Sequence, residues 1–398
     1  MAKGRIVPTK PRLLAIADAV AHTGFSLVLH SIMDELKQDW DISVLGINYM
    51  GDPHGYQYPI FPASLGGDVY GFNRLPQLLD GLKPDLVFMI NDPWIIKDYI
   101  KLAKERNIPA VAYVPVDSPN IKKDFSISLN DLACTVGYTQ FAIDELQKSG
   151  FAGKSTIIPH GVDITLFRPM SKQEAREKLG LGQDWYIVGN LSRNQPRKRL
   201  DLMLQYFSEW WNRIGKPRHV RLYWHGALQD LGYDVLQLAQ YFGVEDQLII
   251  TSPKITAAQG IPKDLLPYIY NSFDVQINTA LGEGYSLPQL EGSACRVPQI
   301  VPNWSGLGEW MEGAANLVEC TSICVNTGGI NTIGGVVDKE QFISALDLMY
   351  TDEKYRKIMA QKAYALISKP IFRWENIAKR FDQVFREALN EHRNSNTG

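Results

Sequence analysis

The sequence predicts an α/β protein in which two Rossmann-like, parallel-sheet domains face a central cleft. The chain has 398 residues, which exceeds the length over which one hydrophobic core usually grows. In each half, short apolar runs typical of buried strands alternate with amphipathic helical segments. Because open parallel sheets bind ligands beyond the carboxyl ends of their strands, we expect the functional site between the two domains.

The first half is predicted to form the N-terminal domain, residues 1–168. Residues 13–17 and 42–47 indicate strands on either side of a helix near residues 25–36, which makes a βαβ unit. Residues 85–90 and 110–114 are further apolar runs typical of buried parallel strands. A helix is predicted between them at residues 99–106, and residues 155–158 form the last apolar run of this half.

The second half is predicted to form the C-terminal domain, residues 169–372. A polar helix at residues 172–179 opens it, and a strand at 185–189 leads into a helix at 200–214 whose apolar residues recur at helical spacing. Helices rich in charge follow residue 339. The remaining predicted strands lie at residues 221–224, 247–250, 275–277 and 298–301.

Charge and cysteine content narrow the possible partners. Lys and Arg together number 41 and Asp and Glu 43, so no overall field favours nucleic acid, and any anion site must be local. The four cysteines lack metal-ligand spacing, which indicates reduced thiols. No apolar run approaches the roughly 18 residues that span a bilayer. We therefore expect a cytoplasmic protein, with peripheral membrane contact as an open alternative.

A basic loop follows the strand at 185–189. It places Arg193, Arg197, Lys198 and Arg199 between a strand end and a helix start. Helix N-terminal amides and the positive end of the helix dipole attract anions, and Arg193 and Lys198 could add charged hydrogen bonds to phosphate oxygens. The loop is thus a candidate diphosphate site; the alternative is a solvated basic loop.

The segment 282–291 places one carboxylate at a strand exit and a second in the first turn of a helix. Glu283 is predicted to bind sugar hydroxyls and Glu291 a ribose diol, since a carboxylate can accept two hydroxyl bonds. The alternative for Glu291 is a carboxylate that only complements the helix dipole. Ser286 and Gln289 suit a capping box. The backbone amides predicted to face a bound anion are those of Gly284, Tyr285, Ser286 and Leu287.

These residues resemble the family-4 retaining glycosyltransferases. The resemblance is carried by the Glu-x7-Glu pair Glu283 and Glu291, the segment 278–288, His160-Gly-Val-Asp163 with Phe167-x-Pro169, and residues 372–378. It implies a GT-B fold whose last helix, about residues 373–398, crosses back onto the first domain. It also implies retaining, metal-independent transfer of a hexose from a UDP- or GDP-sugar, without a cofactor, to a saccharide, lipid-linked, protein or small-molecule acceptor.

The resemblance also assigns roles to residues. Arg193 and Lys198 would neutralise the diphosphate, and Glu291 would bind the ribose. Glu283 and the amides of residues 284–287 would hold the transferred sugar and phosphate. The loop that contains Gly24, Phe25 and Ser26 would close over the diphosphate from the opposite domain.

Several further candidates keep two interpretations. Asp117 stands where many family members have a histidine near the acceptor, and it either replaces that histidine in catalysis or caps the following turn. His160 is a catalytic candidate or a histidine satisfied by backbone at a strand end. Tyr285 and Trp304 are expected to flank the cleft and could stack on a sugar or base.

Metal and dinucleotide chemistry find little support in the sequence. The only Asp-x-Asp, Asp39-Trp40-Asp41, precedes a predicted strand and is expected at the surface. No Gly-x-Gly-x-x-Gly fingerprint occurs, which argues against an NAD-dependent oxidoreductase. The open alternatives are a carbohydrate-binding or scaffold protein without turnover, and a sugar phosphorylase or epimerase on the same fold.

Overall fold

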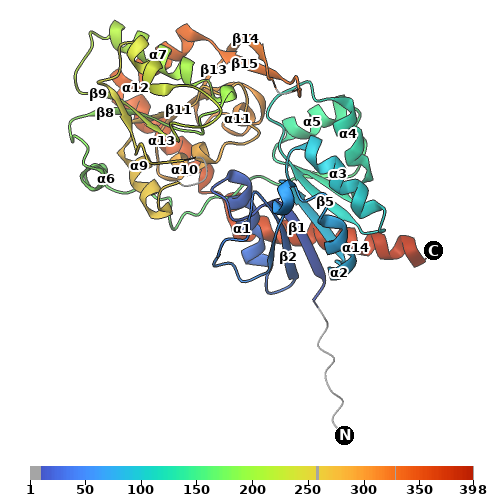
Figure 1. The fold of residues 1–398 in the computed structure, drawn as a ribbon. Coiled ribbons are helices and arrows are strands. Elements are labelled where there is room, and N and C mark those ends of the chain that lie inside the picture. The colour runs from blue at the N-terminus through green and yellow to red at the C-terminus, as the bar shows by residue number, and fades with distance from the viewer. Residues whose placement is uncertain (1–9, 257–259, 328, 398) are drawn as a thin grey trace.

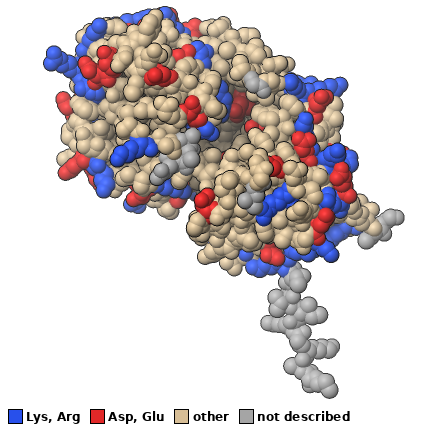
Figure 2. Space-filling model, in the orientation of Figure 1, with Lys and Arg blue, Asp and Glu red and all other residues tan. Residues whose placement is uncertain are grey.

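The computed structural model describes residues 10–256, 260–327 and 329–397, and these form two α/β lobes with a hollow between them (Figure 1, Figure 2). Two parallel sheets, of seven and six strands, form the centres of the lobes. The predicted fold class is therefore confirmed.

The first sheet has the strand order β3-β2-β1-β4-β5-β6-β7, and every neighbouring pair is parallel. Its central strands are buried along almost their whole length, as expected when helices cover both faces. The strands are β1 (Arg12–Asp18), β2 (Asp41–Ile47), β3 (Ile60–Pro62), β4 (Leu86–Ile90), β5 (Ala110–Val114), β6 (Cys134–Gly137) and β7 (Ser155–Ile157). The helices are α1 (Gly24–Leu36), α2 (Leu75–Leu82), α3 (Pro93–Lys104), α4 (Lys123–Ser128) and α5 (Gln140–Lys148).

The second sheet has the order β10-β9-β8-β11-β12-β13 and is also parallel throughout. Its strands are β8 (Tyr186–Leu191), β9 (Val220–His225), β10 (Leu248–Ile250), β11 (Val275–Ile277), β12 (Gln299–Pro302) and β13 (Asn316–Val318). Its helices are α6 (Lys172–Leu179), α7 (Leu200–Arg213), α8 (Val235–Tyr241), α9 (Leu266–Ser272), α10 (Leu287–Ala294), α11 (Ser305–Trp310), α12 (Lys339–Thr351) and α13 (Glu353–Ile367).

An antiparallel hairpin, β14 (Cys320–Val325) and β15 (Ile333–Val337), stands apart from both sheets. Its tip reaches the first lobe, where the amide of Ile333 donates to the carbonyl of Pro119 at 3.0 Å. The side-chain amide of Asn120 donates to the carbonyl of Asn331 at 2.9 Å. The hairpin therefore bridges the two lobes at one end of the hollow.

The last helix, α14 (Trp374–Thr397), leaves the second lobe and packs beneath the first sheet (Figure 1). Phe88 of β4 contacts Phe381 and Phe385 of this helix, with ring centroids 5.3 and 4.9 Å apart. Burial of these aromatic rings fixes the helix on the first lobe.

Most predicted elements lie within a residue or two of their observed positions, but several differ. The helix predicted at 99–106 begins earlier, because Pro93 occupies its first turn, where proline is favoured. The short strands β3, β6 and β13, of three or four residues each, were not among the predicted strands. Asp39 lies just before β2 and Asp41 is its first residue, and both are exposed, as predicted.

Candidate functional site

The centre of the candidate site is Glu283, which lies in the loop between β11 and α10 and is only 5% exposed. Its carboxylate accepts a hydrogen bond from Lys198 Nζ at 2.5 Å and one from Arg197 Nη1 at 3.2 Å. Burial alone would raise the pKa of Glu283, but these two cations outweigh it and hold the pKa near 2. Glu283 is therefore a fixed anion at neutral pH.

A short 3₁₀ turn, Pro196–Lys198, brings the two cations to Glu283 from the loop after β8. Arg197 also donates to the carbonyl of Gly282 at 3.0 Å. Burial and the nearby Arg197 lower the pKa of Lys198, and the Glu283 carboxylate opposes this shift. Arg197 was counted in the basic loop but not among the predicted site residues, and consecutive cations placed after a proline were the only signal for it.

Arg193 is held elsewhere. It forms a two-bond ion pair with Asp230, with N–O distances of 3.1 Å for both contacts, and its side chain is 47% exposed. Among the described residues, no hydrogen bond or ion pair joins Arg193 to Glu283. The structure thus places Arg197, and not Arg193, beside Lys198 at this carboxylate.

Asp117 follows β5 in the first lobe and connects the two lobes. Its carboxylate accepts a hydrogen bond from the backbone amide of Gly284 at 2.7 Å and lies 3.2 Å from Arg197 Nη1. The amide of Gly284 was predicted to face a bound anion, and a protein carboxylate occupies that direction instead. Asp117 is therefore in contact with Arg197 and with the second lobe, and both interpretations of it stay predictions.

The start of α10 differs from the predicted capping box. Ser286 has a φ of 74°, and its side chain makes no capping bond to the backbone of the helix. The hydroxyl donates to the side-chain oxygen of Gln289. A capping serine takes an extended backbone conformation, which a left-handed Ser286 lacks. The capping box is therefore wrong, although Pro288 does lie in the first turn as predicted.

Glu291, one turn along α10, is 9% exposed and accepts a hydrogen bond from the Tyr270 hydroxyl at 2.6 Å. It lines a pocket of about 370 Å³, here called the Glu291 pocket. Residues of α1, of the linker at 161–167 and of the start of α14 complete its wall, and Lys263 also contributes. Glu291, which is predicted to bind the ribose, thus faces an open cavity at the boundary between the lobes.

The loop that begins α1 approaches the same segment from the first lobe. A Cβ atom built on Gly24 would lie 3.3 Å from Leu287 Cδ1, so the start of α1 and the start of α10 are in close contact. Ser26 is buried and donates its hydroxyl to the carbonyl of Ala19. Its amide donates to the Thr23 hydroxyl at 3.2 Å, and Phe25 packs on the core. Gly24 is thus the member of this trio that faces the second lobe.

His160 lies in a buried aromatic cluster and does not line the Glu291 pocket. Its Nδ1 is 2.8 Å from the Tyr113 hydroxyl, and Tyr138 and Tyr285 pack against its ring. Burial lowers its pKa to about 3, so the ring is neutral at physiological pH. A tyrosine hydroxyl, and not the backbone alone, satisfies this histidine, and the geometry gives it a packing role.

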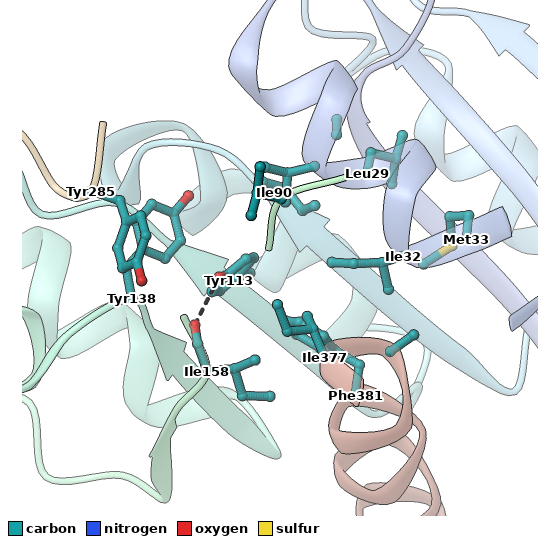
Figure 3. Packing of buried hydrophobic residues seen from close by; sticks show 14 of the residues in the cluster. Leu29, Ile32, Met33, Ile90, Tyr113, Tyr138, Ile158, Tyr285, Ile377 and Phe381 are labelled. Atoms are coloured by element: carbon teal, nitrogen blue, oxygen red, sulfur yellow. Dashed lines mark hydrogen bonds between the residues drawn. The ribbon is translucent and has the colours of Figure 1, made fainter. Parts of the chain in front are cut away.

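Tyr285 and Trp304 both pack against other parts of the protein. The ring of Tyr285 stacks on Trp310, with ring centroids 4.9 Å apart, and is 3% exposed. Tyr285 belongs to the same buried cluster as Tyr113 and Tyr138 (Figure 3). A Cβ atom on Gly335 of the hairpin would overlap the Trp304 ring, which therefore packs on β15. The expectation that Tyr285 flanks the cleft is wrong, because the hydrophobic core buries its ring. Trp304 is partly exposed, and its place beside the cleft stays a prediction.

Glu283, Lys198, Arg197 and Asp117, with the backbone of Gly282 and Gly284, are here called the Glu283 network. A second cavity, of about 490 Å³, borders this network and is here called the Trp94 pocket. Its wall contains Asp117, Arg197 and Gly282 from the network, and Trp94 from the start of α3. The tip of the hairpin forms a further side. The segment that leads into α10 thus contributes Leu281 and Gly282 to the Trp94 pocket and Leu287 and Glu291 to the Glu291 pocket, and Glu283 lies between these pairs in sequence.

No cluster of three or more metal-ligating side chains occurs in the described part of the chain. Within the same residues, no helix is both long and apolar enough to cross a membrane. All four cysteines are free thiols.

Glu291→Gln tests the electrostatics of the Glu291 pocket. Burial raises the pKa of Glu291 to about 7, above its unfolded value of 4.5. The stability that its neutral form contributes is complete below pH 4.5 and is lost as the pH rises through 7. Relative to wild type, the glutamine variant should gain up to roughly 3 kcal/mol between pH 5 and pH 8. Thermal melting across this range measures the gain, and a pH-independent difference would contradict it.

Comparison with known proteins agrees with this architecture. No protein-family model matches the chain. In sequence, it is 25% identical over 253 residues to a D-inositol 3-phosphate glycosyltransferase from Acidothermus cellulolyticus, a match that covers 61% of this chain and 50% of that protein. The chain thus spans about half the length of this relative.

Solved structures resemble it along nearly their whole length. Sucrose-phosphate synthase from Thermosynechococcus elongatus superposes with a TM-score of 0.76 at 16% identity, over 96% of this chain and 100% of that one. HepE from Anabaena, in complex with UDP-glucose, gives a TM-score of 0.70 at 16% identity, over 94% and 99%. The chain therefore has the GT-B fold of such glycosyltransferases.

Proposed function

We propose that the protein is a glycosyltransferase that moves a hexose from a UDP- or GDP-sugar to an acceptor hydroxyl. The observation that carries the proposal is the Glu283 network, in which a buried carboxylate is paired with two cations beside the Trp94 pocket of a GT-B fold. The relative from Acidothermus cellulolyticus is named a glycosyltransferase, and HepE was crystallised with UDP-glucose, which supports the same class of activity.

In this proposal, the two ends of the donor lie on either side of the start of α10, with the nucleoside in the Glu291 pocket. The Glu291 pocket receives the nucleoside, with the ribose hydroxyls at Glu291, and the sugar lies at Glu283 on the far side of the α10 start. The diphosphate then lies between the cavities, near the beginnings of α1 and α10, where helix amides and dipoles favour anions. Lys198 and Arg197 are the nearest cations in the Glu283 network.

The proposed transfer retains the anomeric configuration and uses no metal. The bond between the anomeric carbon and the diphosphate oxygen breaks, and the acceptor oxygen forms a bond to the same carbon on the same face. The acceptor proton passes to an oxygen of the departing diphosphate. Fixed cations stabilise the developing charge, which is the kind of preorganisation that often supplies the largest catalytic term.

A donor screen tests the proposal. The protein is incubated with UDP- and GDP-linked hexoses, and released nucleoside diphosphate and new glycosides are followed by mass spectrometry. We expect slow hydrolysis of at least one donor without acceptor, and transfer when an acceptor is added, with and without a chelator. Binding without turnover would favour a carbohydrate-binding or scaffold protein, and turnover that needs phosphate or returns an epimer would favour a phosphorylase or epimerase.

A further inference from the structure

The Trp94 pocket adjoins the proposed reaction centre. Its volume of about 490 Å³ lies in the range of small-molecule sites. Asp117, Arg197 and Gly282 belong both to its wall and to the Glu283 network, so a hydroxyl group bound there would lie beside a sugar held by Glu283. We infer that this pocket binds the acceptor, and that the acceptor is an uncharged hydroxyl compound with an apolar face. The inference rests on the proposed function.

The charges of the pocket disfavour a phosphorylated acceptor. Among the described residues of its wall, the cations are Arg197 and Arg199, and both are already paired. Arg197 lies 3.2 Å from both Asp117 and Glu283. Arg199 donates hydrogen bonds to the Asp201 carboxylate, of 2.9 Å from Nε and 2.8 Å from Nη2. A phosphate group would have to break one of these ion pairs before it gained a cation.

Asp92 adds a further acidic group to the wall of the Trp94 pocket. It adds a third carboxylate to a wall that has two guanidinium groups. Burial, together with the nearby Asp117, raises the pKa of Asp92 to about 7, so near neutrality part of the population carries a proton there. In that form Asp92 can donate to a ligand oxygen as well as accept from a hydroxyl. Hydroxyl groups are matched by this wall, whereas anions are not.

Two lysines near the pocket do not change this conclusion. Lys97 and Lys122 lie over the ring of Phe125, with Nζ 5.6 and 5.7 Å from its centroid, and neither lines the pocket. The Phe125 ring in turn lies 6.0 Å from Trp94. Both ammonium groups are thus associated with an aromatic ring beyond the wall.

The remaining wall is largely apolar and aromatic, and part of it is open to solvent. Leu231 is 77% exposed and Val325 is 51% exposed, although both lie at the pocket. Exposed apolar side chains that gather at one cavity are typical of a ligand site. An aromatic ring such as Trp94 also offers a face on which a sugar ring or an aryl group can stack. The larger apolar members of the wall include Trp94, Ile121, Leu231, Tyr233, Leu281 and Ile330.

Binding of three matched ligands tests the inference. Glucose, phenyl β-glucoside and phenyl β-glucoside 6-phosphate are titrated calorimetrically into the full-length protein in the presence of UDP. We expect phenyl β-glucoside to bind most tightly, and about tenfold or more tighter than its phosphate ester. Equal or tighter binding of the phosphate ester would overturn the inference, and so would binding of glucose as tight as that of phenyl β-glucoside.

Two variants locate the preference in the pocket. Asp201→Asn releases Arg199, so binding of the phosphate ester should improve by roughly tenfold while that of phenyl β-glucoside changes little. Trp94→Ala should weaken phenyl β-glucoside to the level of glucose. Asp80→Asn is the matched control, because it releases Arg106 from an equivalent two-bond pair on the first lobe. If Asp80→Asn improves phosphate binding as much as Asp201→Asn does, the pocket is not the site.

The outcome is separable from that of the proposed function. Ligand binding is measured without turnover, whereas donor hydrolysis is measured without acceptor. If no donor is hydrolysed but the three ligands bind with the expected relative affinities, transferase activity is refuted and the preference of the pocket for uncharged ligands is not. Donor hydrolysis with the opposite ligand order would refute only the inference about the acceptor.

Discussion

Replacing Lys198 with methionine should lower the rate of sugar transfer by about 10²–10³-fold. Losses of this size follow when an enzyme loses one preorganised hydrogen-bond donor that stabilises charge in the transition state. Lys198 Nζ lies 2.5 Å from the Glu283 carboxylate, and its side chain is only 13% exposed. Methionine keeps most of the apolar length of the side chain and removes the charge. The rate constant and the Michaelis constant for the donor, measured separately, show whether the loss lies in turnover or in binding.

Lys172→Met is the matched control for this variant. Lys172 forms a comparable ion pair, with Nζ 2.6 Å from Asp274, on the second lobe and outside both pockets. Both variants remove one partner of a lysine–carboxylate pair, so both should lose stability. Only Lys198→Met should lose transfer under conditions where both are folded. Equal activity losses in the two variants would remove Lys198 from the proposed machinery.

The strands and the position of the basic loop could be predicted because they depend on local pattern. Apolar runs such as those of β4 and β5 are contiguous, and α6 and β11 begin and end at the predicted residues. The loop after β8 could also be recognised as cationic. The sequence could not predict which cation of this loop pairs with Glu283. That choice depends on distant residues, because Asp230 pairs with Arg193 and Asp117 approaches Arg197 from the other lobe.

The other errors have the same physical origin. His160 is surrounded by aromatic residues from three distant segments, at Tyr113, Tyr138 and Tyr285, and no spacing in sequence reveals such a cluster. Ser286 has the composition of a capping residue, but its left-handed backbone is imposed by its surroundings. The sequence pattern therefore could not predict roles that depend on long-range packing or on backbone conformation.

Gly282→Ala should force the two lobes apart at the reaction centre. A Cβ atom on Gly282 would overlap the carbonyl oxygen of Asp117 and the hydroxyl of Ser118, and both belong to the opposite lobe. Backbone cannot yield as a flexible side-chain end can, so the first lobe must move. A displacement of about 1 Å between reacting groups can cost 10²-fold in rate. We expect a loss of that order in transfer, and a larger radius of gyration in small-angle scattering.

Gly81→Ala separates this effect from the general cost of adding a methyl group. Gly81 lies inside α2, and a Cβ atom there would meet nothing within 4 Å. Alanine should stabilise that helix by roughly 0.5–1 kcal/mol and leave transfer unchanged. The Asp117 carboxylate accepts from the Gly284 amide and pairs with Arg197 only when the lobes meet, so Gly282→Ala should also free Arg197 from Asp117. Full transfer activity in Gly282→Ala would show that contact between the lobes at Asp117 is not required for the reaction.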